Sequence, residues 1–170
     1  METLRKLTLE GQLGAARFGM TEHRLFELLG PPPGWFAMPG TIGAWHERDF
    51  WKARIWYYES DVVGFGFDEQ RSINRLLVDL SDYELRPIPH WFVGWFPPPG
   101  TRIGELKCRL SDAGIPSREH IYKEDYWLLF GDRAYALTLG KTASPDILKV
   151  ELIISYRDER DLRTAVPGLS

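Results

Sequence analysis

The sequence predicts an α+β protein: two helix-plus-antiparallel-meander repeats forming a mainly antiparallel sheet, with helices on one face. Three observations support this fold class. Residues 51–80 contain three short runs of strand-forming residues separated by turn residues. A short helix with clear start and stop signals precedes them. The same order, a helix and then strands, returns in weaker form between residues 101 and 156.

Alternation identifies the strands of the first repeat. Residues 54–58 are rich in strand formers, and turn residues follow them. In the next run Val63, Phe65 and Phe67 point to one side, and the glycines between them leave the other side open to a helix, a ligand or a partner. The third strand is expected over residues 73–80. Because a meander with one apolar face is not stable alone, a helix is expected to cover it.

That helix is expected from Thr21 to Leu29. Thr21 is a favoured N-cap residue, and Leu25, Leu28 and Leu29 form an apolar stripe. Gly30 ends the helix, and the three prolines after it prevent its continuation. The segment from residue 31 to residue 50 is expected to be a long loop.

The second repeat follows the same order. Its helix is expected over residues 101–113, with Ile103, Leu106, Leu110 and Ala113 at helical spacing and Gly114 after its end. The strands expected after it span residues 126–130, 134–139 and 149–156.

We interpret the two halves as an internal duplication, with one repeat at 1–89 and the other at 90–170 in one compact unit. The offsets match Gly30 with Gly114, Phe65 with Leu137, and Leu77 with Ile153. The sequence leaves open whether the repeats share one continuous sheet. The charged tail, residues 157–170, is expected to fray or dock loosely.

Three segments carry a family resemblance: Gly19-Met20-Thr21 at the helix start, Leu28-Leu29-Gly30-Pro31 at its end, and the strand pattern of residues 55–80. This arrangement resembles the repeat of the beta-lactamase inhibitor protein and is similar to the BamE-type outer-membrane assembly lipoproteins. Residues 101–156 match only in plan. The resemblance implies tandem repeats whose sheets form a concave, aromatic-rich surface that grips another protein, and similar folds occur among immunity proteins of bacterial toxin systems. The chain lacks the lipobox cysteine of the BamE type near its N-terminus, so that role is not carried over.

Composition excludes several classes of function. The net charge of −3 disfavours a dedicated nucleic-acid binder. A single cysteine excludes an internal disulfide framework and fits a reducing compartment. The first residues contain no apolar core of a signal peptide, and no apolar run is long enough to cross a bilayer. We therefore expect a cytoplasmic protein that does not bind membranes.

The sequence contains no motif that indicates catalysis, a metal site or a cofactor. Cys108 is expected to be a half-buried structural cysteine in the second helix. His46-Glu47 matches half of a zinc-protease motif, but no second histidine follows at the required spacing.

Aromatic residues give the stronger functional signal. Seven tryptophans in 170 residues exceed what a core of this size requires, so some are expected at a working surface. Phe36 and Phe96 lie beside several of them in predicted loops. Trp56 and Tyr58 are expected on the exposed face of their strand. The candidate partner-binding residues are Trp35, Trp45, Trp56, Tyr58, Trp91, Phe92 and Trp95.

These features favour a non-enzymatic protein-binding module, such as a bacterial immunity or inhibitor protein that blocks a toxin or enzyme by steric occlusion. One alternative is a small-molecule-binding protein or enzyme with an aromatic pocket between the sheet and residues 31–50. Another is a structural module that self-associates through the aromatic residues. The sequence leaves the oligomeric state open.

Overall fold

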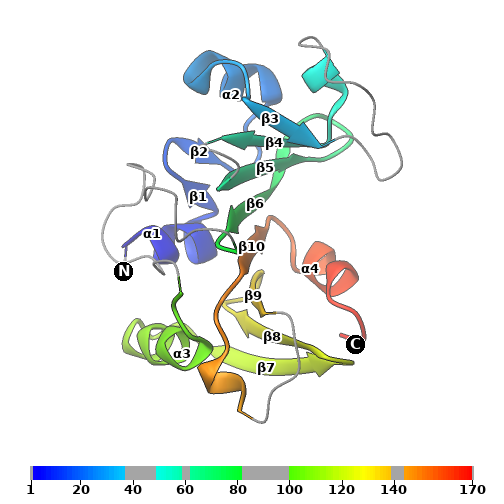
Figure 1. Ribbon diagram of the computed structural model, residues 1–170. Helices are drawn as coiled ribbons and strands as arrows, with labels where there is room; N and C mark the ends of the chain where they lie inside the picture. Colours follow the sequence, from blue (N-terminus) through cyan, green and yellow to red (C-terminus); the bar gives the residue numbers. More distant parts are fainter. Residues whose placement is uncertain (1, 37–48, 59–61, 82–99, 139–143, 170) are drawn as a thin grey trace.

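A single eight-stranded antiparallel sheet forms the centre of the computed structural model, which describes residues 2–36, 49–58, 62–81, 100–138 and 144–169 (Figure 1). The strands of the first half are β3 (Gly34–Phe36), β4 (Ile55–Tyr58), β5 (Val63–Phe67) and β6 (Ile73–Asp79). Those of the second half are β7 (Ser117–Tyr122), β8 (Asp125–Phe130), β9 (Ala134–Thr138) and β10 (Leu152–Tyr156). Their order across the sheet is β3-β4-β5-β6-β10-β9-β8-β7. The predicted α+β class is confirmed, and the two meanders share one continuous sheet.

The two halves meet where β6 pairs with β10, and the register of this pair is symmetric. Leu77 lies opposite Ile154, Asp79 opposite Leu152, and Arg75 opposite Tyr156. Adding 77 (154 − 77) to the β6 residue number and subtracting 77 from the β10 residue number exchanges the Asp79–Leu152 pair with the Arg75–Tyr156 pair and leaves Leu77–Ile154 unchanged. A pseudo-two-fold axis therefore passes through the Leu77–Ile154 pair. Leu77 is the counterpart of Ile154, one residue away from the match with Ile153 that the sequence offsets indicate. Descent from a duplication stays a prediction, and the proposed boundary at residues 89 and 90 lies outside the described residues.

Each meander has a fourth strand that the sequence did not predict, β3 or β7, at an outer edge of the sheet. β3 lies inside the segment expected to be a loop, and its three residues are too few to show alternation. β7 is mostly exposed and carries Arg118, Glu119 and His120. Charged edge strands protect a sheet from further pairing, and the same charges hide the hydrophobic period in the sequence.

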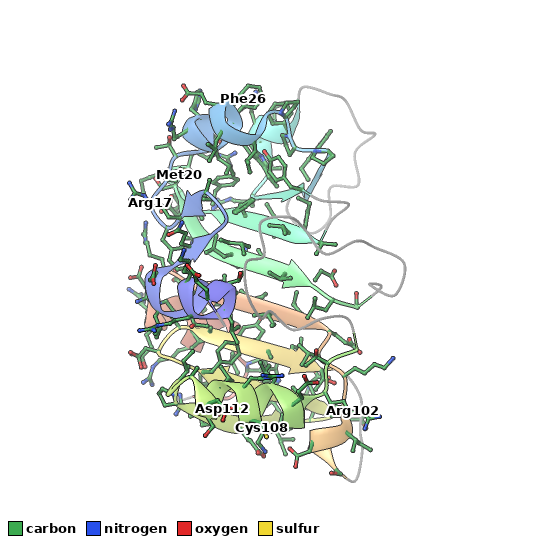
Figure 2. All side chains as sticks on the ribbon, turned by 90° about the vertical axis from the view of Figure 1, so that its left-hand side faces the viewer. Arg17, Met20, Phe26, Arg102, Cys108 and Asp112 are labelled. Atoms are coloured by element: carbon green, nitrogen blue, oxygen red, sulfur yellow. The ribbon has the colours of Figure 1, made fainter. Side chains whose placement is uncertain are left out.

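Two helices cover one face of the sheet in equivalent positions, α2 (Glu22–Leu29) and α3 (Ile103–Asp112) (Figures 1 and 2). The Thr21 side chain accepts a hydrogen bond from the backbone N–H of Arg24 at 3.3 Å, as expected of an N-cap. Leu25 is fully buried, whereas Leu28 is 40% exposed, so the predicted stripe is wrong at Leu28. In α3 the predicted stripe residues Ile103, Leu106 and Leu110 are buried, whereas the fourth, Ala113, lies at the C-cap and is only partly buried.

An N-terminal segment fills the space between these helices over the centre of the sheet. It consists of α1 (Glu2–Arg5), the π-helical turn η1 (Lys6–Glu10), and a hairpin of β1 (Gln12–Leu13) and β2 (Ala16–Arg17). Figure 2 shows this segment between α2 above and α3 below. Leu4 and Leu7 are fully buried, and the Ser155 hydroxyl of β10 donates a hydrogen bond to the Leu7 carbonyl at 3.0 Å. The segment therefore shields the junction of β6 and β10 from water.

The C-terminal segment covers the opposite face of the second half. It forms α4 (Glu159–Ala165), drawn on the other side of the sheet from α3 in Figure 1. Leu162 and Val166 are buried in a cluster with Trp127, Tyr135 and other residues of this face. The His120 ring nitrogen Nε2 lies 2.8 Å from the Pro167 carbonyl. The prediction that residues 157–170 fray or dock loosely is wrong for the described residues 157–169, because Leu162 and Val166, four residues apart, are both buried against the sheet.

Gly64 and Gly66 of β5 point to the face opposite α2, where side chains of neighbouring strands cover them. A Cβ atom on Gly64 would lie 3.0 Å from Cε1 of Tyr57, and one on Gly66 would lie 2.7 Å from Nε of Arg75. The absence of side chains at these glycines therefore lets Tyr57 of β4 and Arg75 of β6, their partners on the neighbouring strands, approach β5 closely.

Truncation of Leu162 to Ala tests the anchoring of α4. The side chain is 4% exposed, so its loss is expected to lower the free energy of unfolding by about 3 kcal/mol. Urea denaturation of the two proteins measures this difference. The control is Ile147→Ala, because Ile147 is 57% exposed and is expected to cost less than about 0.5 kcal/mol. Equal losses in the two variants would show that α4 is not anchored.

A second prediction concerns Glu151, which immediately precedes β10. Burial raises the pKa of its carboxyl above the ordinary value of 4.5, and the charges of Asp79 and Asp125 raise it further. The folded state therefore retains the proton to higher pH than the unfolded state, and stability falls as the pH rises from about 4.5 through the raised pKa.

Glu151→Gln is accordingly expected to raise the melting temperature at about pH 7 and to change it little at about pH 3.5, where the carboxyl is protonated in both states. Thermal melts followed by circular dichroism at both pH values provide the measurement. The exposed Glu124→Gln variant is the control. A lower melting temperature for Glu151→Gln at neutral pH would contradict the prediction.

Candidate functional site

Aromatic side chains gather at one end of the sheet, where α2 meets a short 3-10 helix, η2 (Asp49–Lys52). We call this group the aromatic platform. It comprises Phe26, Trp35, Phe50, Trp51, Trp56 and Phe67. The ring centroids of Phe50 and Trp51 are 4.8 Å apart, those of Trp51 and Trp56 5.2 Å, and those of Trp56 and Phe67 4.9 Å. Several pairs meet edge to face, the arrangement that aromatic rings prefer.

The platform has a buried base and a half-exposed rim. Trp56 is completely buried, and its indole N–H donates a hydrogen bond to the Phe50 carbonyl at 2.8 Å. Trp51 and Trp35 are half-buried and pack against the core. On the outer side of Trp51 lies the His23 ring, 4.8 Å away between centroids, with its side chain 78% exposed. Trp51 is therefore held between rings while part of its surface faces solvent.

The prediction that Trp56 and Tyr58 lie on an exposed strand face is wrong. Both side chains point to the face that α2 covers, and Tyr58 donates a hydrogen bond from its hydroxyl to the Gly30 carbonyl at 3.0 Å. Burial raises the pKa of the Tyr58 hydroxyl. The four residues of β4 are all large and apolar or aromatic, so alternation does not distinguish the buried side. Trp35 lies at the rim of the platform. The other predicted partner-binding residues lie outside the described residues: Trp45, Trp91, Phe92 and Trp95.

Arg71 fixes the platform to the sheet. Its Nε donates to the Glu22 carboxylate at 2.6 Å, and its two terminal nitrogens donate to the carbonyls of Ala53 and Trp51, each at 2.7 Å. The guanidinium carbon also lies 5.3 Å from the centroid of the Phe67 ring. One side chain thus joins the first turn of α2, the end of η2 and strand β5. Arg71 adopts a left-handed backbone conformation, with φ of 60°, which aims its side chain at these groups.

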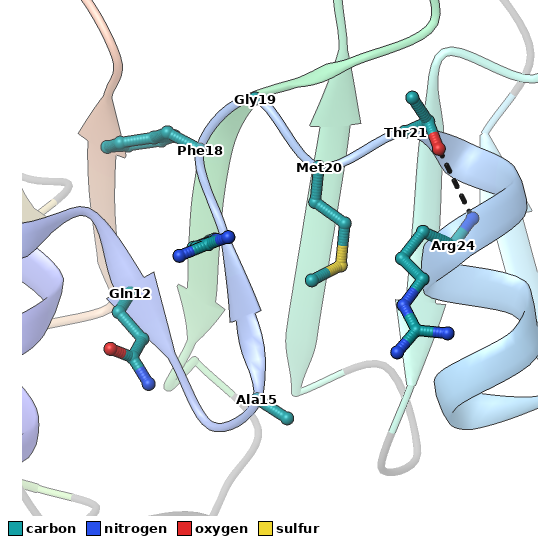
Figure 3. A pocket seen from close by; sticks show the side chains of 8 residues that line it. Gln12, Ala15, Phe18, Gly19, Met20, Thr21 and Arg24 are labelled. Carbon is teal, nitrogen blue, oxygen red and sulfur yellow. Dashed lines mark hydrogen bonds between the residues drawn. The ribbon is translucent and has the colours of Figure 1, made fainter.

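An open groove of about 770 Å³ lies on the other flank of α2. We call it the arginine groove. Its lining residues are Gln12, Ala15, Arg17, Phe18, Gly19, Met20, Thr21 and Arg24. Figure 3 shows Met20 and Arg24 extending side by side, with Gln12 across from them. The sequence analysis missed this site. The only feature of the sequence that could have indicated this groove is the pair of arginines, Arg17 and Arg24, on either side of the Gly19-Met20-Thr21 motif.

The remaining chemical candidates give no reaction centre. Cys108 is exposed on α3, which corrects the half-buried position that we expected (Figure 2). Helical spacing turns it away from the stripe of Leu106 and Leu110. His46 lies outside the described residues. Within the part of the chain that the structure describes, no three His, Cys, Asp or Glu side chains group in a way that could hold a metal ion. None of the described helices combines the length and apolar character needed to span a membrane.

Comparison with known proteins assigns no family. The chain matches no family model, and no sequence among the curated proteins matches it. A similar solved structure is that of an extracellular protein containing a SCP domain from Bacillus anthracis str. Ames, with 13% identity and a TM-score of 0.40. The similarity spans 86% of this chain and 46% of that chain. A likeness of this size does not define a shared fold or a shared function.

Loss of the Arg71 side chain is expected to destabilise the protein and loosen the platform. Arg71→Ala removes the partner of a mostly buried carboxylate, at a cost of about 3 kcal/mol in the free energy of unfolding. Arg71→Gly removes the same contacts but relieves the left-handed strain, so it should be more stable than Arg71→Ala by up to about 1 kcal/mol. Urea denaturation measures stability, and near-ultraviolet circular dichroism reports the packing of the tryptophans.

The control for this comparison is Arg160→Ala on the exposed side of α4, which should leave both signals unchanged. An Arg71→Ala variant as stable as wild type, with an unaltered tryptophan signal, would contradict the role assigned to Arg71.

Proposed function

We propose that this chain is a non-enzymatic protein-binding module that acts in the cytoplasm as an immunity or inhibitor protein, blocking a toxin or enzyme by covering its surface. The observation that carries the proposal is the half-exposed Trp51, held between His23 on one side and the buried rings of Phe50 and Trp56 on the other.

Such a residue is well suited to a protein interface. Tryptophan is enriched among the residues that contribute most to binding energy, where a large ring meets a partner in a water-excluded pocket. A ring that is already fixed loses little conformational freedom on binding, so more of its contact energy contributes to affinity. Arg71 holds the backbone carbonyl of Trp51 itself, which adds to this preorganisation.

Direct contact among the aromatic rings favours a surface over a pocket. The described rings lie 4.8–6.2 Å apart between centroids, so they fill the space between α2, η2 and β4 with one another. A small molecule that bound among these described rings would require some of them to separate. Contact with a partner uses their outer edges as they stand.

The resemblance of the repeats to the beta-lactamase inhibitor protein supports the same type of function, since it implies an aromatic-rich surface for gripping another protein. We propose that the remaining predicted residues also contact the partner. They are Trp35, at the rim of the platform, and Trp45, Trp91, Phe92 and Trp95, which lie outside the described residues. The single cysteine, an exposed free thiol, fits the reducing conditions of the cytoplasm.

The proposal is tested by capturing the partner from the native host with immobilised protein, identifying it, and titrating the purified pair by calorimetry. Trp51→Ala is expected to weaken binding by about tenfold or more, and His23→Ala by a smaller factor. The matched control is Tyr122→Ala, which removes a partly exposed aromatic ring on β7 at the far end of the sheet and should leave the affinity unchanged. Inhibitor function further requires that one equivalent of this protein abolish the partner's activity.

Retained affinity in Trp51→Ala, with the melting temperature of each variant confirmed above the assay temperature, would overturn the assignment of the surface. Two other results would replace the proposed function. A small molecule that copurifies and quenches tryptophan fluorescence would favour the aromatic-pocket alternative. Self-association in light scattering that Trp51→Ala abolishes would favour the structural module.

A further inference from the structure

The arginine groove is positively charged along its lining. Arg17 and Arg24 line it, and none of its eight lining residues is acidic. Arg17 is exposed and makes no ion pair with any residue that the structure describes. Arg24 pairs with Glu27 at 2.8 Å, but both side chains are more than 60% exposed. Exposed pairs of this kind contribute little, so Arg24 can exchange Glu27 for a carboxylate of a ligand at small cost.

The remaining lining residues suit a peptide. Gln12 and Thr21 supply polar groups, and Phe18 and Met20 supply apolar surface. Methionine adapts its shape to different side chains and recurs at surfaces that bind varied peptides. Guanidinium groups bind carboxylates through paired hydrogen bonds. A volume of about 770 Å³ is within the usual range of ligand sites.

Net charge argues against a nucleic acid as the occupant. The chain carries a charge of −3, which repels a long polyanion, and two lining arginines are fewer than the extended basic surface that nucleic-acid binders present. A short acidic peptide segment needs only local complementarity.

From these observations we infer that the arginine groove binds an acidic segment of the partner protein, with carboxylates on Arg17 and Arg24 and an apolar side chain on Met20. This inference rests on the proposed function and extends it, because it specifies the chemistry of the partner.

Helix α2 connects the two surfaces. His23 and Phe26 contact Trp51 of the aromatic platform, whereas Arg24 lines the groove. Leu28, the exposed leucine of α2, lies one turn after Arg24 and adds apolar surface beside the groove. A partner that straddles α2 therefore meets aromatic rings on one flank and guanidinium groups on the other.

The test uses a fluorescein-labelled hexaglutamate peptide and measures its anisotropy with the full chain at low ionic strength. Wild type is expected to bind the peptide, and Arg17→Glu/Arg24→Glu to bind it at least about tenfold more weakly. The neutral variant Arg17→Gln/Arg24→Gln should also lose most of the affinity, which separates loss of the site from general repulsion. Both arginines are exposed, so the melting temperatures should stay close to that of wild type.

Arg163→Glu is the matched control. Arg163 pairs with Glu159 on the exposed side of α4, as Arg24 pairs with Glu27 on α2. Its substitution by Glu lowers the net charge by as much as Arg17→Gln/Arg24→Gln does, but at a remote place. It should alter the affinity by less than about twofold. Equal weakening in Arg163→Glu and in the groove variants would overturn the inference. So would tighter binding of a labelled hexathymidine oligonucleotide, or displacement of the peptide by inorganic phosphate at equivalent charge concentration.

The outcome is separable from that of the proposed function. Trp51 is not among the residues that line the groove, so the Trp51→Ala variant should bind hexaglutamate as wild type does. If the natural partner is lost by Trp51→Ala but retained by Arg17→Glu/Arg24→Glu, the proposed function stands and the inference about the groove fails. If the groove variants no longer bind hexaglutamate while Trp51→Ala still binds the natural partner, the result supports the inference about the groove and contradicts the assignment of the aromatic platform as the binding surface.

Discussion

The pairing of β6 with β10 is the interaction on which the rest of the structure depends. Each meander alone has an unpaired inner edge, and the antiparallel ladder from Arg75 to Asp79 satisfies both edges at once. It also makes two apolar faces continuous, so that one core runs from α2 to α3 and a second runs beneath α4. Without this ladder, each half would be a small sheet with one helix, below the size at which a core is readily stable.

The two ends of the chain complete this junction from opposite sides. The N-terminal segment seals it on the face shared with α2 and α3, where Leu7 receives the Ser155 hydrogen bond. The C-terminal helix covers Ile154 and Tyr156 on the other face. The two meanders therefore provide the sheet, and the two terminal segments bury its centre. This division places α2, the aromatic platform and the arginine groove at the outer end of the first half, away from the junction.

Local signals in the sequence were sufficient for most of the fold. Thr21 and Gly30 bounded α2 correctly because caps depend on one or two residues. The alternation of Val63, Phe65 and Phe67 identified β5 and the side of it that faces the core under α2, because the intervening positions are glycine. Edge strands β3 and β7 gave no such pattern, since short or charged edges lack a hydrophobic period. The anchoring of α4 by Leu162 was missed because it depends on the far face of a sheet assembled from both halves.

The candidate site was harder to predict because it is built from distant positions. Glu22 and Arg71 are 49 residues apart, and no local pattern connects them. Composition indicated an excess of aromatic residues, but it could not assign Trp56 to the base and Trp51 to the rim. That assignment depends on the direction of each side chain relative to α2. The arginine groove arises where a hairpin, a turn and a helix start come together, and none of these elements suggests a site alone.

The symmetric register of β6 and β10 has a consequence for the pairing of β6 with a strand of its own sequence. Since Leu77 lies on the axis, β6 is complementary to a second copy of itself: Arg75 would face Asp79, Leu76 would face Val78, and Leu77 would face Leu77. Two first halves meeting through β6 would rebuild an eight-stranded sheet with the same layout, in which opposite charges lie side by side. The register that joins the two halves of one chain is thus one that β6 could also form with a second copy of itself.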